Sequence, residues 1–204
     1  MKLGIIIPYR ERKDHLQAST PILKQFGHIY VIEQMDKQPF NRGKLINIGF
    51  LEFKKEFDYF AGHDVDLIPQ ATGYYTYSDI PCHLATQAEQ FGYQMPYEKY
   101  FGGVTLFPND IFEKVNGFPN TIWGYGSEDD ALRLRIEAMS IPIKSRQCKF
   151  SSLPHSRQID NALRLANAKK LKEPIDWEDG LSSCEYEIVH CEDLEHYTLL
   201  QVKL

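Results

Sequence analysis

The sequence lacks three features, and each absence excludes a class of protein. Its four cysteines form no CxxC pair, so we expect no zinc cluster and infer free thiols in a reducing compartment. Its N-terminal apolar stretch covers only residues 3–7, which is too short for a signal peptide or a membrane span. Its net charge is -5, which argues against a general nucleic-acid partner. We therefore expect a cytoplasmic protein without a transmembrane segment, either free or peripheral at the inner membrane.

The overall composition is that of an ordinary globular protein. The chain has 204 residues, of which 43% are hydrophobic and 25% are charged, a balance typical of soluble domains. No internal repeat, linker or low-complexity tract interrupts the sequence. A chain of this length is expected to fold as a single domain, residues 1–204.

The first 70 residues alternate between strand and helix patterns. Strands are predicted at 3–7, 28–33 and 58–66, and helices at 12–26 and 41–57, with Pro21 expected to break or redirect the first helix. This alternation predicts an α/β fold with a parallel sheet. Ligands of such sheets bind beyond the carboxyl ends of the strands, where residues 8–10 and 64–66 lie.

The second half has a mixed pattern. We predict a strand at 100–107, a helix at 108–118 that ends at Asn116 and Gly117, and a C-terminal hairpin at 184–204. Two further helices are predicted at 127–139 and 163–172. Ser127 is the candidate N-cap of the first of these, with Leu132, Ile136 and Met139 on its apolar face.

Two aspartates lie one residue apart at the end of the third predicted strand, in "HDVDLIP" (63–69). An acid pair at this position can hold a divalent cation whose other ligands are phosphate oxygens. The motif is short, and turn capping by Asp64 and Asp66 is the simpler alternative. His63 beside them is expected to be structural.

The stretch "WGYGSEDD" (123–130) places two aromatic residues among glycines, followed by three acids that open a helix. Acids in a first helical turn are stabilised by the helix dipole, which needs no function. Trp123 and Tyr125 between glycines are, however, suited to stacking on a sugar, and the glycines would let the loop close over a ligand. We therefore favour a binding loop here.

Basic residues follow the first strand and open the second helix. Arg10, Arg12 and Arg42 could each bind phosphate with a forked guanidinium, and Phe40 could pack on a base or ribose. Taken singly, such arginines are more often surface residues. His155, in "LPHSRQ" (153–158), has no clear element around it, and local sequence alone does not indicate a ligand.

Taken together, these segments resemble the beta-1,4-galactosyltransferase family (glycosyltransferase family 7). The matching motifs are "IIPYRER" with "HL" nearby, "FNRGKLINIGF", "HDVDLIP", "YFGGVTLF", "NGFPNTIWGYGSEDD" and "HSR", in the family's order between residues 5 and 157. The resemblance implies a GT-A fold, which is Rossmann-like, with a mixed, mainly parallel central sheet and a small C-terminal β-hairpin. A nucleotide-binding half (1–70) would precede an acceptor and catalytic half (71–204). It also implies a UDP-galactose donor, manganese (Mn2+) and inversion at the anomeric carbon.

The resemblance assigns a role to each matching position. Asp129 falls at the catalytic base and Glu128 beside it on the acceptor side, while Tyr100 falls where a tyrosine accompanies galactose. The metal ligands would be Asp66 and His155, with Ser152 where many members have methionine. The acceptor loop would carry Trp123, Tyr125 and Asp130. The donor contacts would be Pro8, Tyr9, Arg10, Arg12, Phe40, Arg42, Asp64, Val65, Tyr100 and Gly103.

The sequence departs from the family pattern at a few positions. No second histidine follows His155 as "HxH", so water or Ser152 is expected to complete the metal shell. Ser127 replaces a glycine and Tyr125 a tryptophan, and the histidine of "HDVD" is closest to members that galactosylate xylose. The membrane anchor and stem of the animal enzymes are not expected, so a bacterial or viral relative is inferred.

The expected function is transfer of galactose from UDP-galactose to a hydroxyl of an oligosaccharide or glycan, with a β-1,4 linkage, in glycan or capsule synthesis. Two alternatives stay open at this point. One is transfer of N-acetylgalactosamine or another sugar from its UDP donor. The other is a non-catalytic protein that binds a sugar nucleotide or a glycan.

Overall fold

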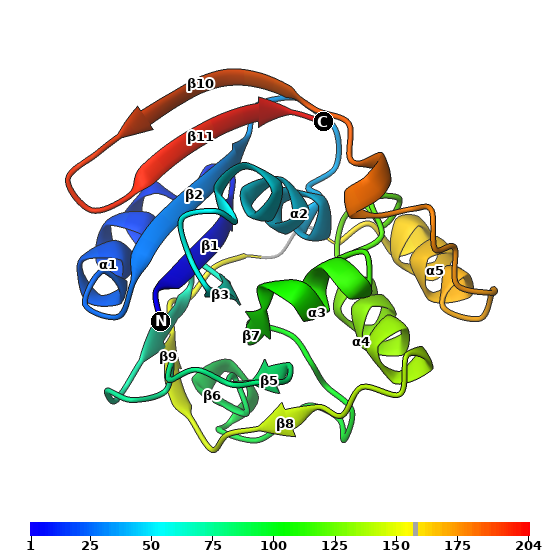
Figure 1. Ribbon diagram of the computed structural model, residues 1–204, viewed down its shortest axis with the longest axis horizontal. Helices are drawn as coiled ribbons and strands as arrows, with labels where there is room; N and C mark the ends of the chain where they lie inside the picture. The colour runs from blue at the N-terminus through cyan, green and yellow to red at the C-terminus, as the bar shows by residue number, and fades with distance from the viewer. Residues whose placement is uncertain (157–158) are drawn as a thin grey trace.

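The computed structural model describes residues 1–156 and 159–204 and has two sheets with helices on both sides of the larger one (Figure 1). The N-terminal third follows the predicted alternation. Strand β1 lies between β2 and β3 and pairs parallel with both. The elements are β1 (Leu3–Tyr9), α1 (Lys13–Leu23), β2 (His28–Gln34), α2 (Arg42–Phe53) and β3 (Tyr59–His63).

The remaining chain completes both sheets. Its elements are β4 (Leu67–Pro69), β5 (Cys82–His83), β6 (Gln87–Ala88), η1 (Glu89–Phe91), β7 (Val104–Pro108), α3 (Asn109–Lys114), α4 (Glu128–Ala138), β8 (Lys144–Ser145), β9 (Lys149–Ser152), α5 (Asn161–Lys170), η2 (Leu181–Ser183), β10 (Glu187–Asp193) and β11 (Thr198–Lys203).

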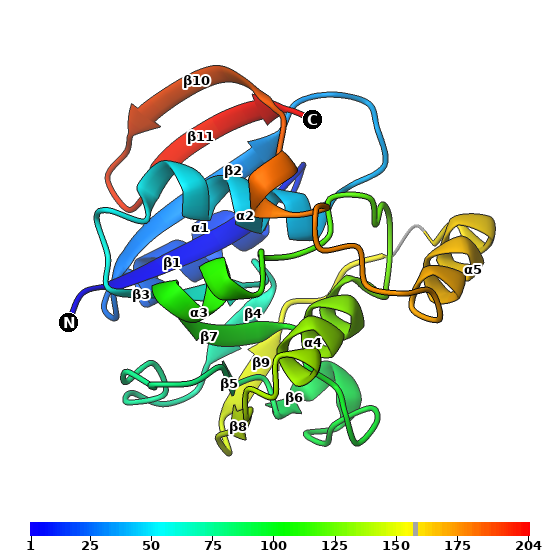
Figure 2. The ribbon, with the colours of Figure 1, turned by 45° about the vertical axis from the view of Figure 1, so that its right-hand side comes forward.

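The large sheet has the order β10-β11-β2-β1-β3-β7-β5-β8, and a small sheet has the order β4-β9-β6. The mixed, mainly parallel sheet is confirmed: β11, β2, β1 and β3 run parallel, and β7 enters antiparallel to β3. The predicted C-terminal hairpin forms, and β11 extends the main sheet by pairing with β2 (Figure 2).

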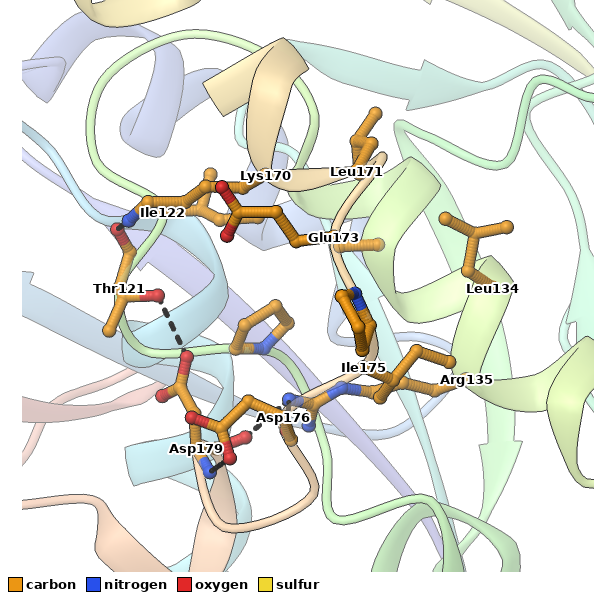
Figure 3. Close-up of a pocket in the computed structure, with 13 residues that line it drawn as sticks. Thr121, Ile122, Leu134, Arg135, Lys170, Leu171, Glu173, Ile175, Asp176 and Asp179 are labelled. Carbon is orange, nitrogen blue, oxygen red and sulfur yellow. Dashed lines mark hydrogen bonds between the residues drawn. The ribbon is translucent and has the colours of Figure 1, made fainter. Parts of the chain in front are cut away.

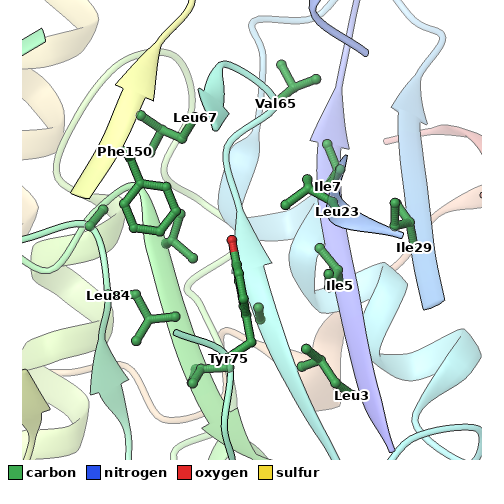
Figure 4. Packing of buried hydrophobic residues seen from close by; sticks show 14 of the residues in the cluster. Leu3, Ile5, Ile7, Leu23, Ile29, Val65, Leu67, Tyr75, Leu84 and Phe150 are labelled. Carbon is green, nitrogen blue, oxygen red and sulfur yellow. The ribbon is translucent and has the colours of Figure 1, made fainter. Parts of the chain in front are cut away.

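The core lies on both faces of β1, because every residue of this strand is buried. Ile5 and Ile7 point into a cluster that includes Tyr75 and Phe150 (Figure 4). Ile6 points to the opposite face, where the second cluster gathers phenylalanines of α2, β3, β7 and α3. Burial on both faces explains the continuous apolar run of this strand.

Helix α2 packs unusually close to the sheet, and this sets the position of its N-terminus. A Cβ added at Gly49 would lie 2.6 Å from the Ile6 side chain, so only glycine permits this approach. Asn41 caps the helix by accepting a hydrogen bond from the Lys44 N–H at 2.9 Å. Arg42, the first residue of α2, is thereby fixed at the carboxyl-end edge of the sheet.

Three details of the predicted helices are wrong. Pro21 lies inside α1 and does not break it, because it occupies the last turn on the exposed side and the helix ends at Leu23 anyway. Ser127 precedes α4, but its side chain makes no capping hydrogen bond and its φ is 81°. Met139, predicted on the apolar face of α4, is 36% exposed, whereas Leu132 and Ile136 are buried.

The predicted boundaries also shift. The third strand ends at His63, so Asp64 to Asp66 form a turn between β3 and β4. In the part of the chain that the structure describes, no helix is long and apolar enough to cross a bilayer.

His63 and His83 give the fold a testable dependence on pH. Burial is the main cause that lowers the pKa of each to about 4, whereas an unfolded histidine has a pKa of about 6.5. The unfolded chain therefore binds these protons first, and stability is lost as pH falls from about 6.5 to about 4. We expect a loss of up to about 3 kcal/mol per histidine.

Urea unfolding measured across this pH range checks the expectation. The His83→Gln variant should lose less stability on acidification than the wild type, because it has one fewer buried histidine that binds a proton more readily in the unfolded chain. Equal pH slopes for the two proteins would contradict the buried neutral state of His83.

Candidate active site

The two aspartates of "HDVD" lie in the turn that follows β3, next to the start of β7. The Asp64 N–H donates to the Gly103 carbonyl at 3.0 Å, which ties the turn to the residue before β7. Gly103 has a φ of 80°, and a Cβ there would lie 2.9 Å from the Ala85 Cβ. Glycine is therefore required at 103 for the backbone that accepts this hydrogen bond.

Arg42 is the centre of the site. Its Nε donates to Asp64 Oδ1 at 2.6 Å and its Nη1 donates to Asp129 Oδ1 at 2.7 Å. The Arg42 side chain is only 10% exposed. One guanidinium from α2 thus joins the acid turn after β3 to the first turn of α4, three segments that are far apart in the sequence.

The acids that open α4 have different surroundings. Asp129 lies against residue 102, where an added Cβ would be 2.5 Å from Asp129 Oδ2. Asp130 accepts a hydrogen bond from the Tyr97 hydroxyl at 2.9 Å. The buried Oε2 atom of Glu128 has no hydrogen-bond partner among the described residues. An unpaired carboxylate oxygen at this position can accept a hydrogen bond from a ligand.

The acid cluster changes the ionisation of its members. Burial raises the pKa of Asp129 well above its usual value; Arg42 opposes the rise, while Glu128 and Asp64 reinforce it. Burial likewise raises the pKa of Glu128, with Arg42 opposing. Burial works against the charge of Arg42, but Asp129 and Asp64 outweigh it and raise the pKa of the guanidinium. Arg42 therefore stays charged, and the carboxyls of Asp129 and Glu128 are more basic than usual.

Asp66 and His155 are in contact, although they are 89 positions apart in the sequence. His155 Nε2 lies 2.9 Å from Asp66 Oδ2, and His155 Nδ1 donates to the Ser156 carbonyl at 3.1 Å. The carbonyl can only accept, so Nδ1 carries a proton; Nε2 faces the Asp66 carboxyl and could offer a lone pair to a metal that replaces the proton shared between these two groups. Burial and Asp64 raise the pKa of Asp66, and His155 opposes this.

One carboxylate oxygen and one imidazole nitrogen facing each other fit a divalent cation. They do not form a complete shell: among the described residues, no group of three or more metal-binding side chains is arranged around one point. Ser152 is oriented elsewhere, because its Oγ accepts a hydrogen bond from the Gln90 N–H at 3.1 Å. The arginine of the "HSR" motif, Arg157, lies outside the described residues.

A second histidine lies near this pair; in the sequence it belongs to the "HL" pair that matches the family, but no role was assigned to it. The His15 ring, from α1, lies 5.9 Å from the His155 ring, and its buried Nδ1 has no hydrogen-bond partner among the described residues. Its position depends on packing between α1 and the small sheet, which local sequence does not reveal.

The residues predicted to contact the donor flank the carboxyl end of β1. Arg10 donates to the Gln38 carbonyl at 2.7 Å and lies over the Phe40 ring, with 5.4 Å between guanidinium carbon and ring centroid. Pro8 and Tyr9 end β1, and Arg12 precedes α1. Val65, predicted to face a ribose, is 7% exposed and packs in the first core cluster.

The predicted galactose contact, Tyr100, lies near Asp129. Its ring packs edge-on to His83, with 5.4 Å between centroids. His83 also contacts the Gly102 carbonyl at 2.9 Å through Nε2. His83 was not singled out in the sequence, since a lone histidine in "PCHLA" carries no motif; its function is to support the segment that contains Tyr100.

The predicted acceptor loop lies beside the Arg42 cluster. Gly124 and Gly126 have φ of 76° and 92°, which explains the two glycines. The Gly124 N–H donates to the Phe40 carbonyl at 2.8 Å, and the Lys44 ammonium lies 6.0 Å from the Trp123 ring centroid. Tyr125 is 42% exposed. The predicted donor and acceptor segments are thus adjacent.

A pocket of about 170 Å³ lies away from this cluster, between α4 and residues 170–179 (Figure 3). Its Arg135 donates to the backbone carbonyls of Asn116, Gly117, Asp176 and Asp179. Thr121 donates to Asp179 at 2.8 Å across the pocket wall. These bonds connect loops, and none of the predicted site residues lines the pocket.

Comparison with known proteins supports the resemblance. A model of the N-terminal region of glycosyl transferase group 7 matches residues 1–78, and a model described as the N-terminal domain of galactosyltransferase matches residues 82–158. Beta-1,4-galactosyltransferase 4 of Mus musculus is 40% identical over 217 residues, which cover 98% of this chain and 63% of that protein. The chain therefore spans less than two thirds of that relative's length.

Two solved structures have a fold similar to that of this chain. The catalytic domain of Drosophila beta1,4galactosyltransferase 7 in complex with xylobiose matches with a TM-score of 0.84 at 28% identity, over 100% of this chain and 94% of that one. A mutant of that enzyme in complex with manganese, UDP-Gal and xylobiose matches with a TM-score of 0.81 at 27% identity, with the same coverage.

These matches place the fold in the GT-A class of glycosyltransferases. More narrowly, the chain belongs to the beta-1,4-galactosyltransferase family, glycosyltransferase group 7.

The Arg42 cluster predicts a large effect on stability. Replacing Arg42 by Met leaves Asp64 and Asp129 without their cation, and breaking a buried ion pair costs about 3–5 kcal/mol. Because both carboxylates are partly exposed, we expect a loss of about 2–4 kcal/mol in the free energy of unfolding. Urea denaturation measures this loss.

Arg133→Met is the matched control. Arg133 forms an ion pair with Glu137 at 2.9 Å along α4, and such a pair on a helix surface contributes less than about 1 kcal/mol. Similar losses for the two variants would show that Arg42 is not a structural centre.

Proposed function

We propose that this protein is an inverting, metal-dependent galactosyltransferase that moves galactose from UDP-galactose to a sugar hydroxyl, with β-1,4 linkage. The observation that carries the proposal is Arg42, which holds Asp64 of the acid turn and Asp129 of α4 in one buried cluster. The similar Drosophila enzyme, described in complex with manganese, UDP-Gal and xylobiose, supports the donor, metal and type of acceptor.

Asp66 and His155 are the proposed metal-binding residues, since each offers one atom to the same point. A bound Mn2+ would neutralise the charge that develops on the UDP leaving group. Arg10 and Arg12, which follow β1, would bind the phosphates of the donor, since an arginine binds phosphate through a forked pair of donors.

Asp129 is the proposed general base. The acceptor hydroxyl transfers its proton to Asp129 while its oxygen forms a bond to the galactose anomeric carbon, and the bond from that carbon to UDP breaks on the opposite face. Arg42 binds Oδ1 of Asp129, which leaves Oδ2 for the proton. The raised pKa of Asp129 favours this step, because a more basic carboxylate takes up a proton more readily.

Two further groups would select the sugars. Glu128 would accept a hydrogen bond from the acceptor through its unpartnered Oε2, and Tyr100, packed on His83, would contact galactose. Trp123 and Tyr125 would cover the acceptor and limit hydrolysis of the donor by water. The cytoplasmic location expected from the sequence stays a prediction.

Replacing Asp129 by Asn tests the base directly. The amide keeps the shape of the side chain but accepts no proton, so we expect transfer to fall by about 10²-fold or more. UDP release is measured with UDP-galactose and N-acetylglucosamine, glucose or xylose as acceptor. Asp110→Asn on the exposed face of α3 is the control and should retain full transfer. Near-wild-type turnover of Asp129→Asn would refute the assignment.

Metal affinity tests the Asp66–His155 pair without relying on activity. Calorimetric titration of manganese should show that Asp66→Asn and His155→Gln each weaken binding by at least about tenfold, since even loss of an outer-shell partner has that effect. Ser152→Ala should bind manganese like the wild type, because the Ser152 hydroxyl already contacts Gln90. A loss with Ser152→Ala as large as that with His155→Gln would make Ser152 a ligand.

A further inference from the structure

Helix α5 stands at the edge of the molecule, beside α4 and away from the main sheet in both views (Figures 1 and 2). Among its ten residues, all within the described part of the chain, Asn167 is the one that is buried. Its exposed fraction is 1%. A buried amide on an otherwise exposed helix needs hydrogen-bond partners, because an unpaired buried polar group is costly.

The partners of Asn167 are backbone carbonyls of the acceptor loop. Its Nδ2 donates to the Trp123 carbonyl at 2.7 Å and to the Gly126 carbonyl at 3.3 Å. These two carbonyls bracket Gly124 and Tyr125. One side chain therefore holds both ends of the segment that carries the two predicted sugar-stacking rings.

Neighbouring residues of α5 strengthen the same attachment. Leu163 packs on Gly124, where an added Cβ would lie 2.6 Å from Leu163 Cδ2. Lys170 donates to the Thr121 carbonyl at 2.7 Å. The contacts of α5 with residues 121–126 are thus mostly directed at backbone atoms, which suits the control of loop conformation more than recognition of side chains.

The loop needs such support because its backbone is intrinsically loose and partly strained. Gly124, Gly126 and Ser127 all have positive φ. The two glycines add conformational freedom, and Ser127 pays a steric penalty at its φ of 81°. A conformation of this kind persists only where surrounding contacts determine it.

We propose that Asn167 is a positioning residue, which holds the Trp123–Gly126 loop in the conformation that presents Trp123 and Tyr125 to the acceptor sugar. This inference rests on the proposed function for its catalytic consequence. The donor segments at the ends of β1 and β3 receive no side-chain hydrogen bond from Asn167, whose bonds go to Trp123 and Gly126. Asn167 is therefore expected to affect acceptor binding more than donor binding, because the loop reaches the donor segments only through the hydrogen bond from the Gly124 N–H to the Phe40 carbonyl and the contact of Lys44 with Trp123.

The test uses Asn167→Asp and Asn167→Ala. The first keeps the shape of the side chain but replaces both N–H donors by an acceptor facing two carbonyls, and the second removes the group without adding charge. Asn161→Ala, on the exposed N-terminal turn of α5, is the matched control. Melting temperatures and far-ultraviolet circular dichroism show that each variant is folded.

Loop order is measured without any substrate. The chain has two tryptophans, so a Trp177→Phe background makes Trp123 the sole reporter of fluorescence. Both Asn167 variants should make Trp123 more accessible to quenching by iodide, while Asn161→Ala should match the parent. Unchanged quenching in both folded Asn167 variants would overturn the proposal.

Steady-state kinetics measure the functional consequence, with UDP-galactose and whichever of N-acetylglucosamine, glucose and xylose the wild type uses best. Loss of buried hydrogen bonds should raise KM for the acceptor by about tenfold or more, with a clearly smaller increase in KM for UDP-galactose. Equal increases in both KM values would overturn the proposal. If the wild type transfers to none of these sugars, the proposed function fails, and the quenching result still decides whether Asn167 orders the loop.

Discussion

The site depends on one buried guanidinium. Arg42 is charged in a place where charge is costly, and it is stable there because Asp64 and Asp129 each accept one of its hydrogen bonds. The bonds join the N-terminus of α2, the turn after β3 and the first turn of α4. Without this cation, Asp64, Asp129 and Glu128 would repel each other in a poorly solvated space. The distance between the proposed donor and acceptor sides would then no longer be set.

Two glycines help to position this cluster in the same way. Gly103 brings its carbonyl to the Asp64 N–H and Gly49 brings α2 close to β1. Both let backbone segments approach more closely than a side chain would permit. The rigid sheet edge therefore carries the charged residues, while the Trp123 loop, with positive φ at Gly124 and Gly126, provides the part that needs external support. A rigid group of charged residues beside an adjustable loop fits the proposed transferase, which must exclude water from its donor.

Much of the fold could be predicted from local patterns. The alternation of the first 70 residues predicted β1, β2, β3 and their helices because buried parallel strands read as continuous apolar runs, as in Ile5 to Ile7. Predictions from local sequence were wrong where the tertiary structure overrides a local preference. Serine is a favoured N-cap residue, but the positive φ of Ser127 directs its side chain away from the capping position. Pro21 lies too near the end of α1 to disturb the helix. That β11 would pair with β2 could not be predicted, since the pairing is parallel and joins the two ends of the chain.

The site was predictable only in part for the same reason. Short motifs drew attention to Asp64, Asp66 and the acids after Trp123, yet His155 was indicated by family resemblance alone, because its contact with Asp66 crosses 89 positions. Sequence reasoning treated Arg42 as a phosphate contact, whereas its strongest partners are two carboxylates from other segments. Asn167 lies in an exposed, unremarkable helix, and only its backbone partners show its importance.

In the proposed reaction, Asp129 on the acceptor side and the leaving UDP on the donor side act from opposite faces of the sugar. The most direct measurement is the anomeric configuration of the first product, read by proton NMR during transfer from UDP-galactose in the presence of manganese. We expect a single product with the configuration inverted relative to the donor. Retention of configuration would contradict a single displacement assisted by Asp129.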